Sequence, residues 1–212
     1  MTIEEGGALQ GRLENLRNFY RLGVRLVTLT WNYPNEIGYP NCEMKYRGQG
    51  LTEFGQQVVA EMNNLGMIID VSHLSDQGFY DVATLSKKPF IASHSNARAV
   101  QDHSRNMTDE MIRIVAQKGG VMGINFSGDF LGGTKNSNVA DMVSHIKHIY
   151  QVGGLDVIAL GTDFDGIDSN LEIANIGEIH KLTDELSKNG FTAAAIEKIA
   201  YQNTLRVIKD CL

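Results

Sequence analysis

The stretch MIIDVSHLS, residues 67–75, places a short apolar run directly before a serine and a histidine. The run 67–71 is almost continuously apolar and β-branched, which is typical of a parallel strand covered on both faces. His73 follows where this strand should end. The stretch PFIASH repeats the arrangement, with a second apolar run (89–93) before His94. The sequence therefore predicts two histidines at the carboxyl ends of two strands.

Strand-like and helical patterns alternate on both sides of this stretch. We expect strands at 24–30, 67–71, 89–93, 119–126 and 155–161. We expect helices at 10–22, 52–65, 76–86, 108–118, 139–152, 176–188 and 192–211, the last with a break. This alternation predicts an α/β fold, either a barrel or a doubly wound sheet. Because no repeat or linker interrupts it, one domain over residues 1–212 is expected.

Polar residues at the strand ends distinguish the two folds. Glu5 follows the short N-terminal stub 1–4, and four of the expected strands end at or just before His73, His94, Asn125 and Asp163. In a (β/α) barrel these ends share one face, which holds the active site. A doubly wound sheet would gather its ligands near one switch point instead. The distribution over many strands favours the barrel.

The residue types at these strand ends suit a metal centre. His73 and His94 offer imidazole nitrogens, and the Glu5 carboxylate could bridge two ions, as in hydrolytic zinc sites. Two ions about 4 Å apart would polarise a carbonyl and lower the pKa of a bridging water. Asp163 would then move a proton from the attacking water to the leaving group.

Each of these residues also has a structural interpretation. A single histidine after a strand is more often a hydrogen-bonding residue than a ligand, and Glu5 alone could be a surface residue. The segment 162–166, TDFDG, could be an Asp-rich turn. His145 and His148 are one helical turn apart, and we expect both to be solvated.

Composition excludes several classes of protein. The net charge of −6, with scattered basic residues, argues against nucleic-acid binding. No apolar run reaches the roughly 18–20 residues of a membrane span. Two cysteines are too few for a disulfide framework. The N-terminus has no secretory pattern, so a cytoplasmic protein is expected.

Several stretches together resemble the membrane dipeptidase (renal dipeptidase) family of zinc metallopeptidases. The similar stretches, in family order, are EGGALQGRLENLRNFYRLGVRLVTLTWN, LTEFGQQVVAEMNNLGMIIDVSHLS, PFIASHSNARAV, RNMTDEMI, GLDVIALGTDFDG and EKIAYQNTLRVI. The resemblance implies a (β/α)8 TIM-type barrel with a two-zinc centre that hydrolyses dipeptides, L,D-dipeptides included.

The resemblance also implies roles for individual residues. Glu5 resembles the carboxylate that bridges both zincs, and His73 and His94 resemble the two histidines of the second zinc. Asp163 resembles the acidic residue beside the attacking water. Arg105 resembles the arginine that holds the C-terminal carboxylate of the dipeptide, a role for which a guanidinium is suited.

Two departures from the family pattern concern the substrate and the first zinc. After the LTLT-like strand, Trp31 and Asn32 stand where animal members have a substrate-contacting histidine; Asn32 could still donate a hydrogen bond to the oxyanion. For holding the C-terminal carboxylate of the dipeptide, Arg98 is an alternative to Arg105. The family's first strand, with its His-x-Asp motif, is absent from the 212 residues, whereas a complete barrel has about 250.

The barrel is therefore expected to be incomplete at the N-terminus, with one set of zinc ligands missing. The sequence could be a fragment, the front could be supplied by a separate chain, or dimerisation could cover the open edges. We expect zinc at His73, His94 and Glu5, and weak or no binding of the first zinc.

Three functions follow from these patterns. The first is a zinc dipeptidase. The second is another amidohydrolase, acting on a cyclic amide or ester, which would need a carbamylated lysine or further histidines at strand ends. The third is a truncated, catalytically impaired fragment or subunit.

Overall fold

The computed structural model describes residues 1–212. The chain divides into two compact units. The first unit comprises residues 1–92 and 207–212, and the second comprises residues 93–206.

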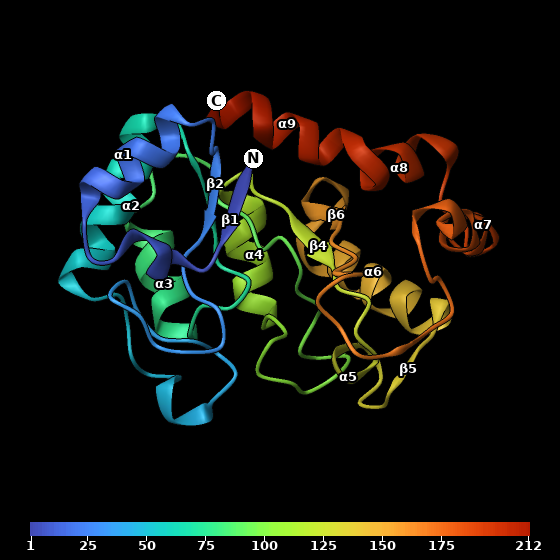
Figure 1. The fold of residues 1–212 in the computed structure, drawn as a ribbon. Helices are drawn as coiled ribbons and strands as arrows, with labels where there is room; N and C mark the ends of the chain where they lie inside the picture. Colours follow the sequence, from blue (N-terminus) through green and yellow to red (C-terminus); the bar gives the residue numbers. More distant parts are fainter. The chain divides into compact units, whose positions relative to one another are not determined.

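The first unit contains a three-stranded parallel sheet in the order β1-β2-β3 (Figure 1). Its strands are β1 (Thr2–Glu4), β2 (Leu26–Thr28) and β3 (Ile68–Asp70). The last residues of the three strands, Glu4, Thr28 and Asp70, are paired in register. Residues in register on parallel strands share one face of the sheet. Glu4 therefore lies on the face where the Thr28 hydroxyl donates to Asp70 at 2.6 Å.

The helices of the first unit follow the prediction within one residue at 52–65 and 76–86, whereas the one expected at 10–22 begins three residues late, at Leu13. They are α1 (Leu13–Arg21), α2 (Glu53–Leu65), α3 (Asp76–Leu85) and the 3-10 turns Gly6–Leu9 and Met44–Tyr46. The Thr52 hydroxyl caps α2 by accepting from Gly55 N at 3.0 Å. Gly66 ends α2 with a φ of 73°. A side chain at Gly55 would collide with the carbonyl of Ile37, so only glycine permits this close packing.

The predicted strand 89–93 forms only one bridge, between Ile91 and Asp70. Ile91 N donates to Ile69 O, and Val71 N donates to Ile91 O, both at 2.9 Å. The pairing is parallel, as expected, but the ladder is short because Pro89 has no amide hydrogen to contribute. The segment still runs beside β3 toward the end that carries His73.

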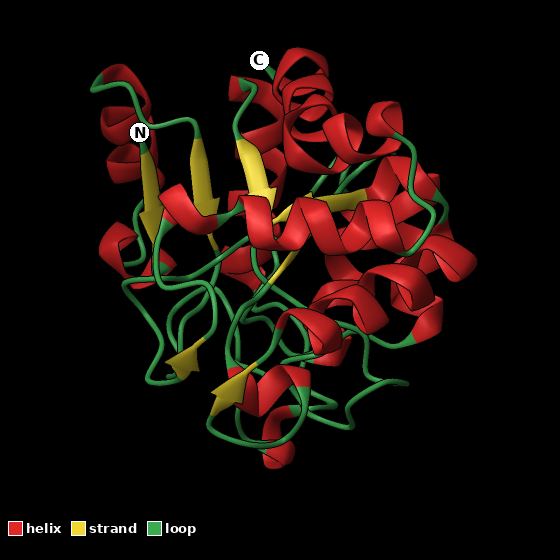
Figure 2. Ribbon diagram, turned by 90° about the vertical axis from the view of Figure 1, so that its right-hand side faces the viewer, coloured by secondary structure: helices red, strands yellow, loops and turns green.

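The second unit contains two short parallel ladders, β4-β6 and β5-β7, among helices (Figure 2). Its strands are β4 (Met122–Ile124), β5 (Asn136–Ser137), β6 (Ile158–Leu160) and β7 (Asn170–Leu171). Its longer helices are α4 (Asp109–Gln117), α6 (Val139–Gly153) and α7 (His180–Lys188). Its shorter helical segments are α5 (Gly128–Leu131), α8 (Ala193–Glu197) and the 3-10 turns Leu155–Val157 and Ile176–Glu178.

The predicted break in the C-terminal helix is a π-helical turn. Residues Lys198–Gln202 form it, between α8 and α9 (Asn203–Cys211). The predicted strand 155–161 is shorter than expected, because Leu155–Val157 forms a 3-10 turn before β6. The π-helical turn is a local irregularity in the C-terminal helix, and it agrees with the interrupted apolar pattern of residues 192–211.

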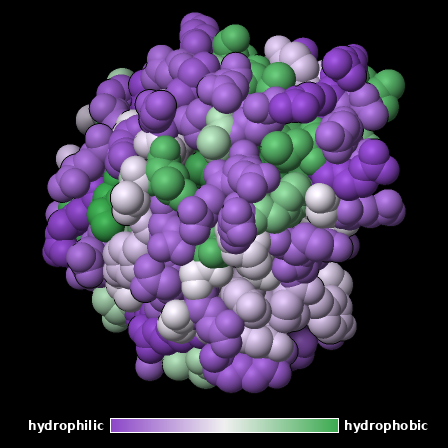
Figure 3. Space-filling view, turned by 90° about the vertical axis from the view of Figure 1, so that its left-hand side faces the viewer, coloured by the Kyte–Doolittle hydropathy of each residue, from purple (hydrophilic) through white to green (hydrophobic).

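None of the helices is both long and apolar enough to cross a membrane. On the face drawn in Figure 3, hydrophilic side chains predominate and the apolar ones form small separate patches. Scattered apolar side chains of this kind are normal on a protein surface.

Candidate functional site

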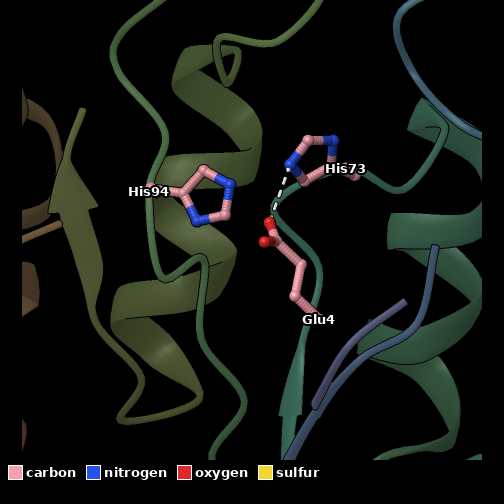
Figure 4. A group of neighbouring side chains, drawn as sticks. All are labelled: Glu4, His73 and His94. Atoms are coloured by element: carbon pink, nitrogen blue, oxygen red, sulfur yellow. Dashed lines mark ion pairs between the residues drawn. The ribbon is translucent and has the colours of Figure 1, made fainter. Parts of the chain in front are cut away.

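The side chains of His73 and Glu4 meet at the carboxyl end of the first unit's sheet. Glu4 is the last residue of β1, and His73 lies three residues beyond the end of β3. His73 Nε2 is 3.3 Å from Glu4 Oε1, and the His73 side chain is buried while Glu4 is exposed. Figure 4 shows this pair. A nitrogen and an oxygen ligand are thus presented side by side.

The other ring nitrogen of His73 also faces an oxygen. His73 Nδ1 lies 3.2 Å from Asn32 Oδ1. A neutral imidazole has only one N–H, so it cannot donate to two oxygen acceptors at once. A cation between Nε2 and the Glu4 carboxylate would satisfy both groups, and imidazole nitrogen with carboxylate oxygen is a donor set that suits zinc. These residues therefore fit a divalent metal.

Glu5, the sequence-predicted ligand, is engaged in a turn. Its carboxylate accepts from Gly7 N at 2.6 Å and from Trp31 N at 3.1 Å. The backbone of Glu5 has a φ of 103°, a conformation that residues other than glycine rarely adopt. The carboxylate beside His73 is that of Glu4, one residue earlier. Neighbouring residues of a strand point to opposite faces, so the register of β1 decides which of the two carboxylates lies beside His73.

His94 begins the second unit on a backbone that two glycines approach closely. A side chain at Gly123 or at Gly161 would collide with the carbonyl oxygen of Ser93. The Ser93 hydroxyl and His94 Nδ1 are 2.7 Å apart and share a hydrogen bond. The glycines thus allow β4 and the end of β6 to pack against the backbone that carries His94.

Asn125 joins Asp163 to the segment that follows His94. Asn125 Nδ2 donates to Asp163 Oδ2 at 2.9 Å. Asn125 is fully buried, and its backbone N–H donates to Asn96 Oδ1 at 2.9 Å. Asn96 Nδ2 returns a bond to Asn125 O at 3.0 Å. Asp163 itself has a φ of 58°. Two of the predicted strand-end residues, Asn125 and Asp163, are therefore in direct contact.

Arg105 and Arg98 differ in what they bind. The Arg98 guanidinium donates to the carbonyls of Asn106 and Ser104, at 2.8 and 3.2 Å, and so closes the loop around Arg105. Arg105 is buried, and its guanidinium carbon lies 5.4 Å from the centre of the Phe130 ring. Arg98 therefore has a structural role in this loop.

Trp31 is largely exposed, and its ring meets Tyr33 edge-on, with centroids 5.8 Å apart. Its backbone N–H donates to Glu5. Asn32, which follows it, directs its side chain to His73. The two residues predicted to contact substrate thus lie in the loop that also contacts the candidate metal ligand.

The prediction that His145 is solvated is wrong. His145 is fully buried, where Nδ1 accepts from Ala97 N at 3.1 Å and Nε2 donates to Leu131 O at 2.9 Å. It fixes the segment that follows His94. Burial lowers its pKa, an effect that outweighs the bond to Leu131. His148, one turn later, is partly buried and pairs with Asp109 at 2.7 Å.

The buried His145 makes stability depend on pH. Its pKa is lower in the folded chain than in the unfolded chain, so the unfolded chain binds the proton first as the pH falls. The contribution of neutral His145 to the stability of the folded chain is complete above the ordinary pKa of about 6.5. It is lost as the pH falls below that value. We expect the fall in melting temperature between about pH 7 and pH 5 to be shallower in His145→Gln, which keeps one acceptor and one donor. Equal slopes in the two proteins would contradict this role.

The family model described as membrane dipeptidase (peptidase family M19) matches residues 1–211. An uncharacterized protein in the pqqA 5′ region of Klebsiella pneumoniae is 35% identical over 98% of this chain and 80% of its own length. An uncharacterized dipeptidase of Schizosaccharomyces pombe is 36% identical over 99% of this chain and 52% of its own length.

Two solved structures share the α/β fold at 30% sequence identity. A metallopeptidase from Rhodobacter sphaeroides, liganded with a phosphinate mimic of the dipeptide L-Ala-D-Ala, has a TM-score of 0.94 over 100% of this chain and 63% of that chain. The metallopeptidase dipeptidase AC also has a TM-score of 0.94, over 100% of this chain and 65% of that one. The chain thus spans less than two thirds of either structure and about half of the S. pombe relative.

Proposed function

Because the chain belongs to the membrane dipeptidase family of metallopeptidases (peptidase family M19), we propose that it hydrolyses the peptide bond of dipeptides with the help of bound zinc. The observation that carries this proposal is the position of His73, which has an oxygen acceptor at each ring nitrogen, one of them the Glu4 carboxylate. A histidine so placed is suited to bind a metal through Nε2.

We propose that Glu4 and His73 of the first unit hold the zinc, and that His94 is a further ligand, as the sequence predicts. Glu4 takes the place that the sequence assigned to Glu5. His94 lies three residues beyond Ile91, which pairs beside β3, so the chain leaves the first unit near the end that carries His73. Zinc bound here would polarise the scissile carbonyl and lower the pKa of the attacking water.

The remaining roles belong to Asp163, Arg105 and Trp31. Asp163 takes the proton of the attacking water and passes it to the leaving amine, while its bond from Asn125 holds its carboxylate in one orientation. Arg105 binds the C-terminal carboxylate of the dipeptide through its guanidinium. Trp31 forms part of the substrate-binding surface.

The fold that we propose for the complete enzyme is a (β/α)8 barrel. Support comes from the parallel strands with intervening helices and from the similarity to solved dipeptidases. The relatives extend beyond the region that they share with this chain. We propose that the additional region supplies the ligands of a second zinc. If it is required for activity, this chain alone is a catalytically impaired fragment, which is our second candidate function.

Metal removal and a substrate panel test the proposal. We expect hydrolysis of L-Ala-L-Ala and L-Ala-D-Ala to stop on chelation and to return with added zinc. The amide of either dipeptide, which lacks the carboxylate that Arg105 binds, should react about 10- to 100-fold more slowly, because a charge-assisted hydrogen bond contributes about 1.5–3 kcal/mol. Hydrolysis that resists chelation would disprove the metal mechanism. Zinc binding without hydrolysis would support the impaired fragment.

A further inference from the structure

We propose that Asn32 is a positioning residue that fixes the tautomer of His73, so that Nε2 is the ring nitrogen left to bind metal. This inference rests on the proposed function. It assigns Asn32 a role toward His73 rather than toward the substrate.

The contact between the two side chains is direct. Asn32 Oδ1 lies 3.2 Å from His73 Nδ1, and the two residues are 41 positions apart in the chain. The His73 side chain is 7% exposed, so water competes little for its ring nitrogens. A buried imidazole takes the tautomer that its fixed neighbours dictate.

The amide oxygen of Asn32 can only accept a hydrogen bond. When it faces Nδ1, that nitrogen must carry a proton, so the ring position that metal can take, in place of any proton there, is Nε2. Nε2 points at Glu4 Oε1, 3.3 Å away, where a cation would be shared by the two groups. Metal-binding histidines commonly donate their other N–H to an oxygen in this way, which orients the ring and raises its basicity.

The loop that carries Asn32 also holds the backbone of His73. Asn41 N donates to His73 O at 2.8 Å, and Asn41 Nδ2 donates to Ser72 O at 3.2 Å. At the start of the loop, Trp31 N donates to the Glu5 carboxylate at 3.1 Å. The loop is therefore anchored near both ends, and Asn32 is held in place against the ring.

The reversed amide gives the opposite prediction. If Asn32 Nδ2 donated to His73 Nδ1, the proton would reside on Nε2, and Nε2–H would donate to Glu4. Zinc would then have to displace this proton, and Asn32 would oppose binding. The tautomer of His73 in the zinc-free protein thus separates the two arrangements.

Two measurements on three proteins test the proposal. The proteins are the wild type, Asn32→Leu, which removes the acceptor at similar size, and Asn32→Asp, which keeps it. The ¹⁵N shifts of the His73 imidazole in the zinc-free protein should report a proton on Nδ1 in the wild type and in Asn32→Asp, but not in Asn32→Leu. Zinc affinity, measured by competition with a chromophoric chelator, should fall about 10- to 100-fold in Asn32→Leu and be retained in Asn32→Asp.

The outcomes distinguish this inference from the proposed function. A wild-type His73 without a proton on Nδ1, or unchanged zinc affinity in Asn32→Leu, would overturn the role of Asn32. Absence of zinc binding in the wild type would instead overturn the metal site, whatever the tautomer. Far-UV circular dichroism of each variant monitors folding, and Asn32→Ser provides a smaller side chain should the leucine variant fail to fold.

Discussion

Glu4→Gln is expected to lower kcat/KM for dipeptide hydrolysis by about a thousandfold and to remove most bound zinc, because metal assistance is worth several kcal/mol and each 1.36 kcal/mol is tenfold in rate. Glutamine matches the size of Glu4 but lacks its charge, so the ligand pair with His73 is lost while the sheet is not disturbed. Zinc per chain, measured by elemental analysis, and kcat/KM check this expectation.

Glu5→Gln is the matched control. Glu5 uses its carboxylate to hold Gly7 N and Trp31 N, and the oxygen of a glutamine can still accept one of these bonds. We expect a lower melting temperature for Glu5→Gln, with most zinc retained. If Glu5→Gln lost zinc and Glu4→Gln kept it, Glu5 would be the ligand, as the sequence first suggested.

The helices could be predicted because their signals are local. Thr52 and Gly66 bound α2, and each acts within a few residues through a cap or a left-handed turn. The core of β3 was equally clear from its apolar run. The segment around Ile91 was predicted too long, because how far a ladder extends depends on partners distant in the sequence, here Asp70 and Ile69.

Which carboxylate lies beside His73 depends on a feature that the sequence does not show. Glu4 and Glu5 are adjacent carboxylates, and which of them shares a face with Thr28 and Asp70 depends on the register of β1 against β2. A shift of one residue exchanges the two faces of a strand. No pattern within the few residues of β1 fixes that register.

Long-range contacts of histidines were also beyond the sequence. His145 accepts a hydrogen bond from the backbone N–H of Ala97, 48 residues away in the chain. Asn32 contacts His73, which is 41 residues away. The helical spacing of His145 and His148 indicated only that they share a face, not that the face is buried. The end of a strand, by contrast, is visible in the sequence.

Asp163→Asn is expected to reduce kcat by about 10²- to 10⁴-fold while zinc per chain stays as in the wild type, since this is the usual contribution of a positioned general acid–base group. Asparagine keeps an oxygen that can accept from Asn125 Nδ2, so the local hydrogen bond can persist. What it loses is the ability to take up and release a proton. Kinetics and metal analysis on one preparation separate these effects.

Asp165→Asn is the control within the same segment. Asp165 is exposed, carries the same charge and lies two residues from Asp163, so any effect of net charge on the segment would appear in both variants. We expect Asp165→Asn to retain activity within about threefold of the wild type, because substitutions at exposed positions rarely exceed 0.5 kcal/mol. Equal losses in both variants, or loss of zinc in Asp163→Asn, would mean that Asp163 acts on the metal site and not as the proton carrier.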